Sequence, residues 1–451
     1  MEFILSAVSI FLIAVGVFFL IRLKGFYFLH PLRVVGAVAR KSPEGGISPF
    51  RAMTMALAGT IGVGNIVGVA SALYLGGAGA IFWMVAGALV AMVLKYAEIV
   101  LAIRHQQHGA DGEPYGGATY YMEAGGTASG HPKWGKVLAC IFAALCVFNA
   151  VGVGCILQSN AVAGACAQAF SIPPWLIGGL LGVLCLITMC GGAKRISALT
   201  EKLVPLMLVV FLVMSIAVLI LRRERILPSA TSIFQDAFSA EALGGGGLGF
   251  LLSRGIRYGI MRGILSNEAG CGTSPMAHAS ACTRSPAAQG VWGLFEVILD
   301  TVLICSITAF VILVSDTGIE AGGEDAIRTA QLAFTSVLGE WSGGLFAIAV
   351  LLFGMATIIC WSHYGMTCIR YLFGRHSHMA VKVFIGVYAL SVVYGAIATP
   401  SVVWTLADIV IALMTVLNLL VLLGMHREVE RETRVFTDSR KKSAQNVTHS
   451  S

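Results

Sequence analysis

The stretch Leu57-Ala-Gly-Thr-Ile-Gly-Val-Gly-Asn-Ile-Val-Gly-Val-Ala70 lies within an apolar run that extends from about residue 53 to residue 75. A run of this length can cross a bilayer as a helix, which needs about 20 residues. The stretch nevertheless contains the four glycines Gly59, Gly62, Gly64 and Gly68. Each of them weakens a helix by roughly 1 kcal/mol relative to alanine. Thr60 and Asn65 add polar groups at mid-membrane depth, where a hydrogen-bonding group without a partner is costly.

A membrane helix with such an interior has two explanations. In the first, the helix is broken, and the freed carbonyl and N–H groups line a cavity that binds an ion or a polar ligand. In the second, small residues such as Gly64 and Gly68 allow another helix to pack closely. The stretch by itself leaves both explanations open.

The composition sets the class of protein. The chain has 451 residues, of which 57% are hydrophobic and 12% are charged, whereas soluble domains contain roughly 25% charged residues. Long continuous apolar runs predict an all-α integral membrane protein whose main partner is the lipid bilayer. The net charge of +7 comes from short loops and the C-terminal tail, which indicates membrane topology and no nucleic-acid partner. The 11 cysteines are scattered through apolar stretches, as expected for small buried side chains without a metal or disulfides.

The apolar runs predict about eleven transmembrane helices. They lie at about 3–23, 50–75, 78–104, 136–158, 173–191, 199–221, 247–270, 287–314, 342–372, 379–398 and 401–424. Lysines and arginines gather in every second connection, which places those connections in the cytoplasm. We therefore expect a multi-pass protein with its N-terminus outside and its C-terminus in the cytoplasm.

The order of the predicted helices suggests four parts. Residues 1–48 form an extra N-terminal transmembrane helix and an amphipathic linker, with a surface helix expected at Pro31–Ala39. A first five-helix repeat covers 49–225. A second repeat with a preceding interfacial loop covers 226–425. The charged tail 426–451 shows no apolar period and is expected to be disordered in the cytoplasm.

A second predicted span is interrupted in the same way as the first. It ends Gly263-Ile-Leu-Ser-Asn-Glu-Ala-Gly-Cys-Gly-Thr-Ser-Pro-Met-Ala-His278, with glycines, a proline and a carboxylate at membrane depth. The two broken spans are five apart, an odd number, so they cross the membrane in opposite directions. Broken helices in matching positions of two halves indicate a transporter built from inverted repeats. A re-entrant packing break in a channel or a membrane enzyme is the alternative.

Broken helices also indicate a class of substrate. A half-helix that begins at a break directs N–H groups and the positive end of its dipole at the cavity, which suits a carboxylate. A half-helix that ends there directs carbonyl oxygens at the cavity, which suits a cation or an ammonium group. Together they suit a zwitterion and a co-transported cation. No phosphate loop, ATP-binding domain or redox motif occurs in the sequence, so we expect an ion gradient as the driving force and no organic cofactor.

Several motifs, in order along the whole chain, resemble those of the alanine or glycine:cation symporter family. They are Ala56-Leu-Ala-Gly-Thr-Ile-Gly-Val-Gly-Asn-Ile-Val-Gly-Val, Gly79-Ala-Ile-Phe-Trp, Lys95-Tyr-Ala-Glu98, Gly191-Gly-Ala-Lys-Arg-Ile, Glu201-Lys-Leu-Val-Pro, Ser266-Asn-Glu-Ala-Gly270, Pro275-Met-Ala-His278, Glu296 with Asp300-Thr301, and Trp404-Thr-Leu-Ala-Asp408. The resemblance implies a leucine-transporter-like fold, a 5+5 inverted repeat with one extra N-terminal helix and two broken helices. It also implies a non-enzymatic secondary transporter that takes up alanine or glycine with sodium, by alternating access, across a bacterial inner membrane. No obligatory protein partner is evident.

The same resemblance assigns roles to residues. For the substrate it implies the N–H groups of Val63 and Gly64 on the carboxylate and Thr60 and Asn65 beside the ammonium group. It adds Gln158 as a substrate residue and Trp361 as the roof of the pocket, and Ile264 and Leu265 would influence the size of the pocket. For sodium it implies the carbonyls of Ala58 and Ile61 and the hydroxyl of Thr357. Structural or coupling roles fall to Ser266, Asn267, Glu268, Glu296 and Asp300.

Two departures from the family pattern bear on the ion and the substrate. The fourth span reads Gly154-Cys-Ile-Leu-Gln158, where the family usually has Gly-Asn before the glutamine motif, and Ala356 replaces a usual serine before Thr357. One hydroxyl fewer would weaken a sodium site or admit a proton. The alternative functions are therefore proton- or sodium-coupled transport of another zwitterion such as glutamine and, more remotely, a membrane-embedded enzyme.

Charged residues within the spans are expected to have partners, because burying a charge is expensive. Lys95 and Glu98 stand one turn apart, which predicts a mutual ion pair. Among Arg254, Arg257 and Arg262, at least one is expected to pair with Glu268. Glu296 and Asp300 are expected to accept hydrogen bonds from the freed N–H groups of the second broken span, with a direct ion-binding role as the alternative. His278 is interpreted as a hydrogen-bonded packing residue rather than a proton site.

Overall fold

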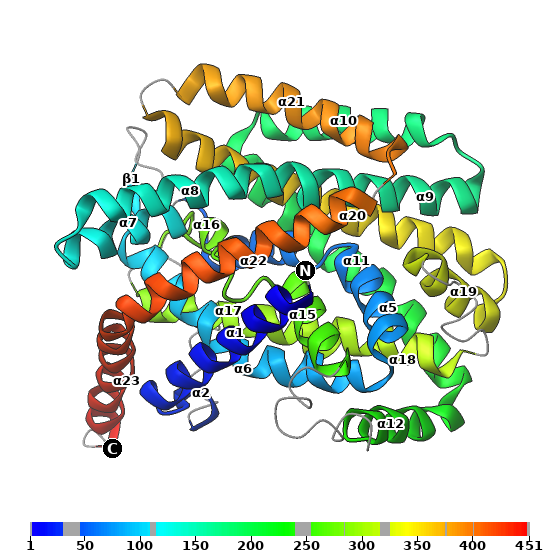
Figure 1. The fold of residues 1–451 in the computed structure, drawn as a ribbon, viewed down its shortest axis with the longest axis horizontal. Coiled ribbons are helices and arrows are strands. Elements are labelled where there is room, and N and C mark those ends of the chain that lie inside the picture. Colours follow the sequence, from blue (N-terminus) through cyan, green and yellow to red (C-terminus); the bar gives the residue numbers. More distant parts are fainter. Residues whose placement is uncertain are drawn as a thin grey trace.

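The computed structural model describes residues 2–29, 46–108, 114–239, 254–283, 285–315, 325–374, 377–399 and 401–448. This part of the chain is almost entirely helical (Figure 1). Its two short strands, β1 (Gln107–His108) and β2 (Pro114–Tyr115), pair antiparallel in the connection after the third predicted span.

The long helices of the first half follow the predicted apolar runs, and the helices Phe26–Leu29, Ala118–Ala128 and Arg223–Ala237 lie outside those runs. In chain order, the helices are α1 (Glu2–Arg22), α2 (Phe26–Leu29), α4 (Pro49–Thr60), α5 (Gly64–Gly76), α6 (Gly79–Arg104), α7 (Ala118–Ala128), α8 (Pro132–Val151), the π-helical segment η1 (Gly152–Leu157), α9 (Gln158–Phe170), α10 (Pro174–Met189), α11 (Gly192–Leu221) and α12 (Arg223–Ala237). The segments α8, η1 and α9 form one continuous span of 39 residues. The fourth span therefore continues well beyond its predicted end at residue 158.

The second half repeats this plan. Its helices are α15 (Arg254–Asn267), α16 (Pro275–His278), α17 (Pro286–Val297), the π-helical segment η2 (Ile298–Cys305), α18 (Ser306–Val314), α19 (Ala326–Leu338), α20 (Trp341–Phe373), α21 (Ser377–Ile397), α22 (Ser401–Gly424) and α23 (His426–Thr448). The predicted surface helix at Pro31–Ala39 and the start of the seventh predicted span lie outside the described residues. The predicted boundary between residues 225 and 226 falls inside α12.

Of the eleven predicted spans, nine correspond to long apolar helices among the described residues when the bent pair α4–α5 is counted as one span. Among the described residues, 8 helices are long and apolar enough to cross a membrane, and the bent pair α4–α5 gives up to 9. The two remaining predicted spans are the 16-residue α10 and the 14-residue α15. The all-α membrane fold with an extra N-terminal helix and two broken helices is confirmed.

The two breaks have the local causes that the sequence indicated. The axes of α4 and α5 differ by 42°, and residues 61–63 between them are not helical. In the second break, α15 ends at Asn267, and both Gly270 (φ 84°) and Gly272 (φ 78°) adopt left-handed backbone conformations. Glycine tolerates this conformation without the clash that a Cβ would cause. Pro275 then begins the short helix α16, where its missing N–H costs nothing.

The spans pack as two groups. The pair α4–α5, α6, α15–α16 and α17–η2 contact one another and contain both breaks. The segments α8–η1–α9, α10, α20 and α21 form the second group, and α10 and α21 lie side by side along one edge of the molecule (Figure 1). Helix α20 contacts both α4 and η1. The first break therefore lies where the two groups meet.

The tail was predicted to be disordered, and for residues 426–448 this is wrong. Helix α23 packs against α6 and α17 (Figure 1), and Val429, Thr433 and Phe436 form its buried stripe. The hydroxyl groups of Thr433 and Tyr96 are hydrogen-bonded at 2.8 Å. Glu428 also forms an ion pair with Arg104 of α6 at 3.4 Å. The apolar period was missed because its central residue is a threonine.

Candidate functional site

At the break between α4 and α5, one backbone N–H has no hydrogen-bond partner among the described residues. The N–H of Gly62 donates to the Asn65 side-chain oxygen at 3.0 Å, and the N–H of Val63 donates to the Gln158 side-chain oxygen, also at 3.0 Å. The N–H of Gly64 donates no hydrogen bond to any acceptor in the described part of the chain. A Cβ placed on Gly64 would meet nothing within 4 Å. The N-terminus of α5 thus presents a free N–H group beside open space.

Two backbone carbonyl groups at the same break accept no hydrogen bond from the described residues. These are the carbonyl groups of Ala58 and Ile61. The carbonyl of Gly59 instead accepts from the indole N–H of Trp361 at 3.3 Å. The hydroxyl of Thr60 turns back along α4 to the carbonyl of Ala56 at 3.3 Å. Free carbonyl oxygens are ligands that sodium ions and ammonium groups use in broken membrane helices.

Side chains of the second helix group close the break from the other side. Gln158 follows directly after the π-helical segment η1, and its side-chain N–H₂ donates to the Val153 carbonyl at 3.2 Å. Such π-helical turns often occur at functional sites. Gly154 lies directly against the Trp361 ring, where a Cβ would collide with it. Thr357, one turn before Trp361, likewise lies where a Cβ on Gly62 would be. Gln158 of the fourth span and Thr357 and Trp361 of the ninth span therefore converge on the break.

Asp300 connects the two breaks. Its carboxylate accepts from the Asn65 side-chain N–H₂ at 2.7 Å, from the Ser266 hydroxyl at 2.8 Å and from the Thr301 hydroxyl at 2.7 Å. Asn267 donates to the Thr301 hydroxyl at 3.0 Å and accepts from the Ala269 N–H at 2.9 Å. Both polar ends of the Asn65 amide are therefore engaged with Gly62 and Asp300. Its predicted position beside a substrate ammonium group stays a prediction.

Replacing Asp300 with asparagine is expected to destabilise the protein by about 3 kcal/mol or more, because hydrogen bonds to a charged group contribute roughly 1.5–3 kcal/mol each. Asparagine also turns one of the two acceptor oxygens into a donor, which would face either the Asn65 amide or the Ser266 and Thr301 hydroxyl groups. The matched control is Asp325→Asn: Asp325 caps the exposed start of α19, and asparagine caps equally well. Unfolding in detergent as a function of temperature measures both variants. If Asp300→Asn unfolded at the same temperature as Asp325→Asn and the unmodified chain, a connecting role for Asp300 would be contradicted.

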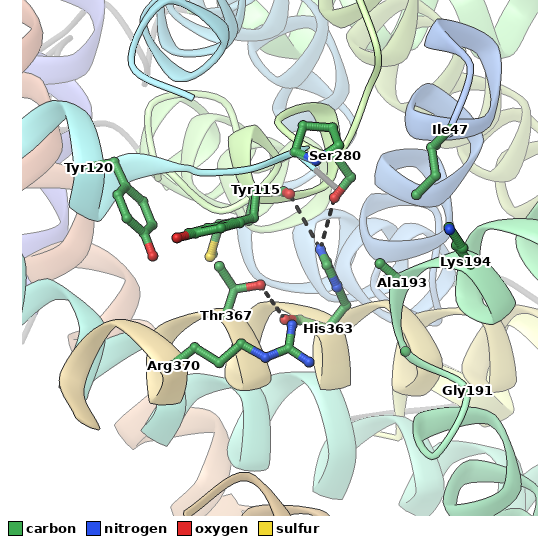
Figure 2. A pocket seen from close by; sticks show the side chains of 13 residues that line it. Ile47, Tyr115, Tyr120, Gly191, Ala193, Lys194, Ser280, His363, Thr367 and Arg370 are labelled. Carbon is green, nitrogen blue, oxygen red and sulfur yellow. Dashed lines mark hydrogen bonds between the residues drawn. The ribbon is translucent and has the colours of Figure 1, made fainter. Parts of the chain in front are cut away.

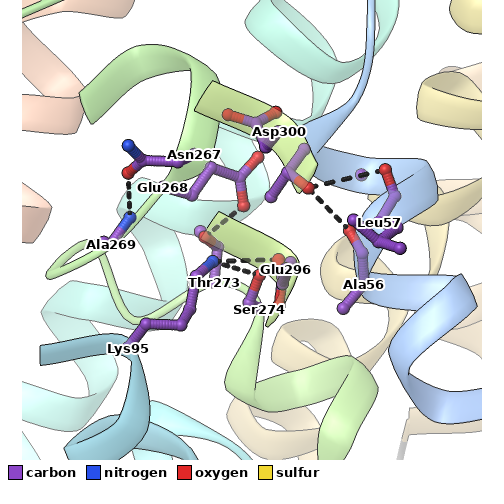
Figure 3. Close-up of polar contacts among 12 residues, drawn as sticks. Ala56, Leu57, Lys95, Asn267, Glu268, Ala269, Thr273, Ser274, Glu296 and Asp300 are labelled. Atoms are coloured by element: carbon purple, nitrogen blue, oxygen red, sulfur yellow. Dashed lines mark hydrogen bonds and ion pairs between the residues drawn. The ribbon is translucent and has the colours of Figure 1, made fainter. Parts of the chain in front are cut away.

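A fully buried charged network supports the second break (Figure 3). The Lys95 ammonium contacts the Glu296 carboxylate at 3.0 Å and the Ser274 hydroxyl at 2.6 Å. Glu296 also accepts from the Ser274 hydroxyl at 2.7 Å. His278 lies 3.1 Å from Glu296 and 2.8 Å from the Gln289 amide nitrogen. With an N–H on Nε2, His278 donates to Glu296 and accepts from Gln289. This agrees with the packing role predicted for His278.

This network corrects two predictions. Lys95 pairs with Glu296 of α17 rather than with Glu98 of its own helix. Glu296 and Asp300 accept from side chains of the broken segment rather than from its backbone N–H groups. Glu98 takes that backbone role, because it accepts from the Gly272 N–H at 3.0 Å.

The surroundings of Glu268 also differ from the prediction. Its carboxylate accepts from the Thr273 hydroxyl at 2.5 Å, and no arginine pairs with it within the described ranges. Arg262 instead forms an ion pair with Asp408 of α22 at 3.2 Å, and Arg257 lies over the Tyr258 ring. Of the two residues expected to influence pocket size, Ile264 is buried and Leu265 is half-buried.

Two residues that support the second break from other helices, Asn418 and Tyr121, were not predicted from the sequence. Asn418 of α22 donates to Glu98 and to the Gly270 carbonyl, the latter at 2.9 Å, and it accepts from the Tyr121 hydroxyl at 2.5 Å. Asn418 is fully buried. The signal was a lone amide side chain inside a long apolar run, which is costly unless its hydrogen bonds are satisfied.

Comparisons with known proteins agree on one family. The sodium:alanine symporter family matches residues 2–450. The sodium/alanine symporter AgcS of Methanococcus maripaludis is 35% identical over 444 residues, or 97% of this chain and 96% of that protein. The probable sodium/glutamine symporter GlnT of Bacillus subtilis is 34% identical over 442 residues, or 96% of this chain and 88% of that protein. A substrate-bound, outward-open structure of a Na⁺-coupled sialic acid symporter shares the fold, with a TM-score of 0.58 and 13% identity, over 93% of this chain and 86% of that one.

Proposed function

Because the chain belongs to the sodium:alanine symporter family, we propose that it imports alanine or glycine together with sodium across a bacterial inner membrane. The family and the named relatives are symporters, so the chain is a transporter and not an enzyme. The choice of amino acid, the inner membrane and an outside N-terminus are our proposals. Access to the site would alternate between the two sides as the two helix groups move relative to each other.

The observation that carries this proposal is the free N–H of Gly64 beside open space. It stands at the start of α5, where the helix dipole favours a negative group, and so it would bind the substrate carboxylate. The N–H of Val63 already donates to the Gln158 side chain, so Gln158 would lie at the edge of this site. When the substrate binds, the N–H of Val63 would donate to the substrate in place of Gln158. The free carbonyls of Ala58 and Ile61, with the Thr357 hydroxyl, would hold the sodium ion.

The packing of Trp361 supports a small substrate. Its ring is buried against Gly154 and tied to the Gly59 carbonyl, so it would leave little depth above the break for a long side chain. Glutamine is the second candidate, because one relative is named a probable sodium/glutamine symporter. Proton coupling is the alternative to sodium, because Ala356 supplies no hydroxyl to the proposed ion site.

Uptake of labelled alanine into proteoliposomes, under a sodium gradient or a proton gradient, tests the proposal. We expect concentrative uptake with sodium alone. Thr357→Val should weaken the apparent sodium affinity about tenfold or more, because one ion ligand is lost and tenfold corresponds to 1.4 kcal/mol. Thr308→Val is the matched control, since Thr308 also makes a hydrogen bond to the carbonyl four residues earlier in a span. Uptake driven only by protons would reject the sodium site, and no uptake of alanine or glycine would reject the substrate.

A further inference from the structure

A pocket of about 270 Å³ lies at the end of the spans that the loop charges place in the cytoplasm, and Figure 2 shows the side chains that line it. It is lined by residues that precede α4, by the β2–α7 segment, by the α10–α11 connection, by α16 and the residues after it, and by the last turns of α20. This volume can hold an amino acid. The predicted roles of the site residues do not use this pocket.

One face of α20 forms the polar wall of the pocket. His363, Thr367 and Arg370 follow each other at intervals of four and three residues, which places them on one stripe of the helix. His363 and Thr367 are 3% and 4% exposed, whereas Arg370 is exposed at the mouth. The stripe therefore runs from a buried imidazole to an accessible guanidinium group. Trp361, which contacts the break, is two residues before His363.

The imidazole of His363 has one satisfied nitrogen and one free nitrogen. Its Nε2 lies 3.4 Å from the Met276 carbonyl and 3.5 Å from the Ser280 hydroxyl (Figure 2). Because a carbonyl can only accept, the neutral ring carries its N–H on Nε2. Nδ1 is then an acceptor, and it is buried without a hydrogen-bond partner among the described residues. A buried polar atom without a partner costs roughly 1–3 kcal/mol, which a donor in the pocket would recover.

The charges of the lining favour an anion. Lys194 and Arg370 line the pocket, and none of the described residues that line it is an aspartate or a glutamate. Arg370 has no carboxylate partner within the described ranges of the chain. A guanidinium group matches the planar geometry of a carboxylate, to which it can make two parallel hydrogen bonds.

We propose that this pocket is a second binding site, specific for a carboxylate, in which Arg370 takes the carboxylate and His363 Nδ1 accepts from an ammonium group when the ligand is an amino acid. The ligand is either the transported amino acid on its way to release or a simple carboxylate from the cytoplasm. The first source rests on the proposed function, and the second does not. Binding here needs no sodium, because none of the proposed sodium ligands lines the pocket.

Equilibrium dialysis of the purified full chain with labelled alanine and labelled acetate, in sodium-free buffer, tests the site. We expect saturable binding that Arg370→Gln weakens about tenfold or more, which is 1.4 kcal/mol. Arg328→Gln, at an exposed arginine of α19, is the matched control and should bind as the unmodified chain does. Arg370→Lys keeps the positive charge but loses the planar guanidinium group that can make two parallel hydrogen bonds. Its affinity should therefore fall between that of the unmodified chain and that of Arg370→Gln.

The two probes separate the sources of the carboxylate. His363→Gln keeps a group near the Nε2 position and removes the Nδ1 acceptor, so it should weaken alanine binding and leave acetate binding unchanged if the amino acid is the ligand. Equal binding of both probes, lost in Arg370→Gln but unaffected by His363→Gln, would identify a simple carboxylate as the ligand. The proposal is overturned if neither probe binds without sodium, or if Arg370→Gln binds both as tightly as the unmodified chain. Failure of alanine uptake under every gradient would remove the proposed function but leave the acetate result valid.

Discussion

Replacing Lys95 with methionine is expected to lower the unfolding free energy by about 3–5 kcal/mol, the usual cost of removing one partner of a buried ion pair. Lys95 and Glu296 are both fully buried, and they join α6 to α17 beside the second break. Methionine has a similar length and fills much of the same space. The loss would therefore come from the uncompensated carboxylate of Glu296 rather than from a cavity.

The double variant Lys95→Met/Glu296→Gln separates charge from packing. It removes both charges, and glutamine can still accept from Ser274 and His278, so most of the lost stability should return. Arg104→Met on the same helix is the control. Its ion pairs with Glu428 and Glu432 are partly exposed, so the change should be about 1 kcal/mol. Unfolding by SDS in mixed micelles measures all three, and a double variant no more stable than the single one would contradict this account.

Replacing Gly64 with alanine is expected to separate stability from transport. Alanine fits, because a Cβ would meet nothing within 4 Å, and helix propensity should add up to about 1 kcal/mol of stability. The new methyl group would nevertheless occupy the space proposed for the substrate carboxylate. A hydrogen bond to a charged group contributes roughly 1.5–3 kcal/mol. We therefore expect sodium-driven alanine uptake to fall roughly ten- to hundredfold.

Two other glycines make this test specific. Gly164→Ala lies on an exposed face of α9, also with nothing within 4 Å, and should leave uptake unchanged. Gly62→Ala would collide with Thr357 and Gln158, so it should lose both stability and uptake. Normal uptake by Gly64→Ala, measured in proteoliposomes at equal protein content, would place the substrate elsewhere.

The features that could be predicted from the sequence are those with local causes. Span lengths follow from apolar runs, and the two breaks follow from glycine and proline within them. The residues around the first break were predicted through a family resemblance. Gln158, Thr357 and Trp361 do lie together there. Their roles toward substrate and sodium stay proposals.

The partners of buried charges could not be predicted, because they depend on which helices become neighbours. Lys95 and Glu98 are one turn apart, but α17 approaches α6 so closely that Gly290 and Gly293 lie against Tyr96 and Lys95. That approach brings Glu296 to the ammonium group. Glu98 instead accepts hydrogen bonds from the N–H of Gly272 and from the Asn418 side chain. Spacing along one helix says nothing about such contacts.

The carboxylate of Asp300 is shared by Asn65 at the first break and Ser266 at the second. A ligand that reshapes the first break must move Asn65, and this movement changes the hydrogen bonding of the second. The two breaks are then thermodynamically linked, and linkage between binding equilibria is reciprocal. Whatever effect a ligand at the first break has on the second break, a change at the second break has the same effect on the affinity for that ligand. The coupling between the two breaks would thus depend on a single shared side chain.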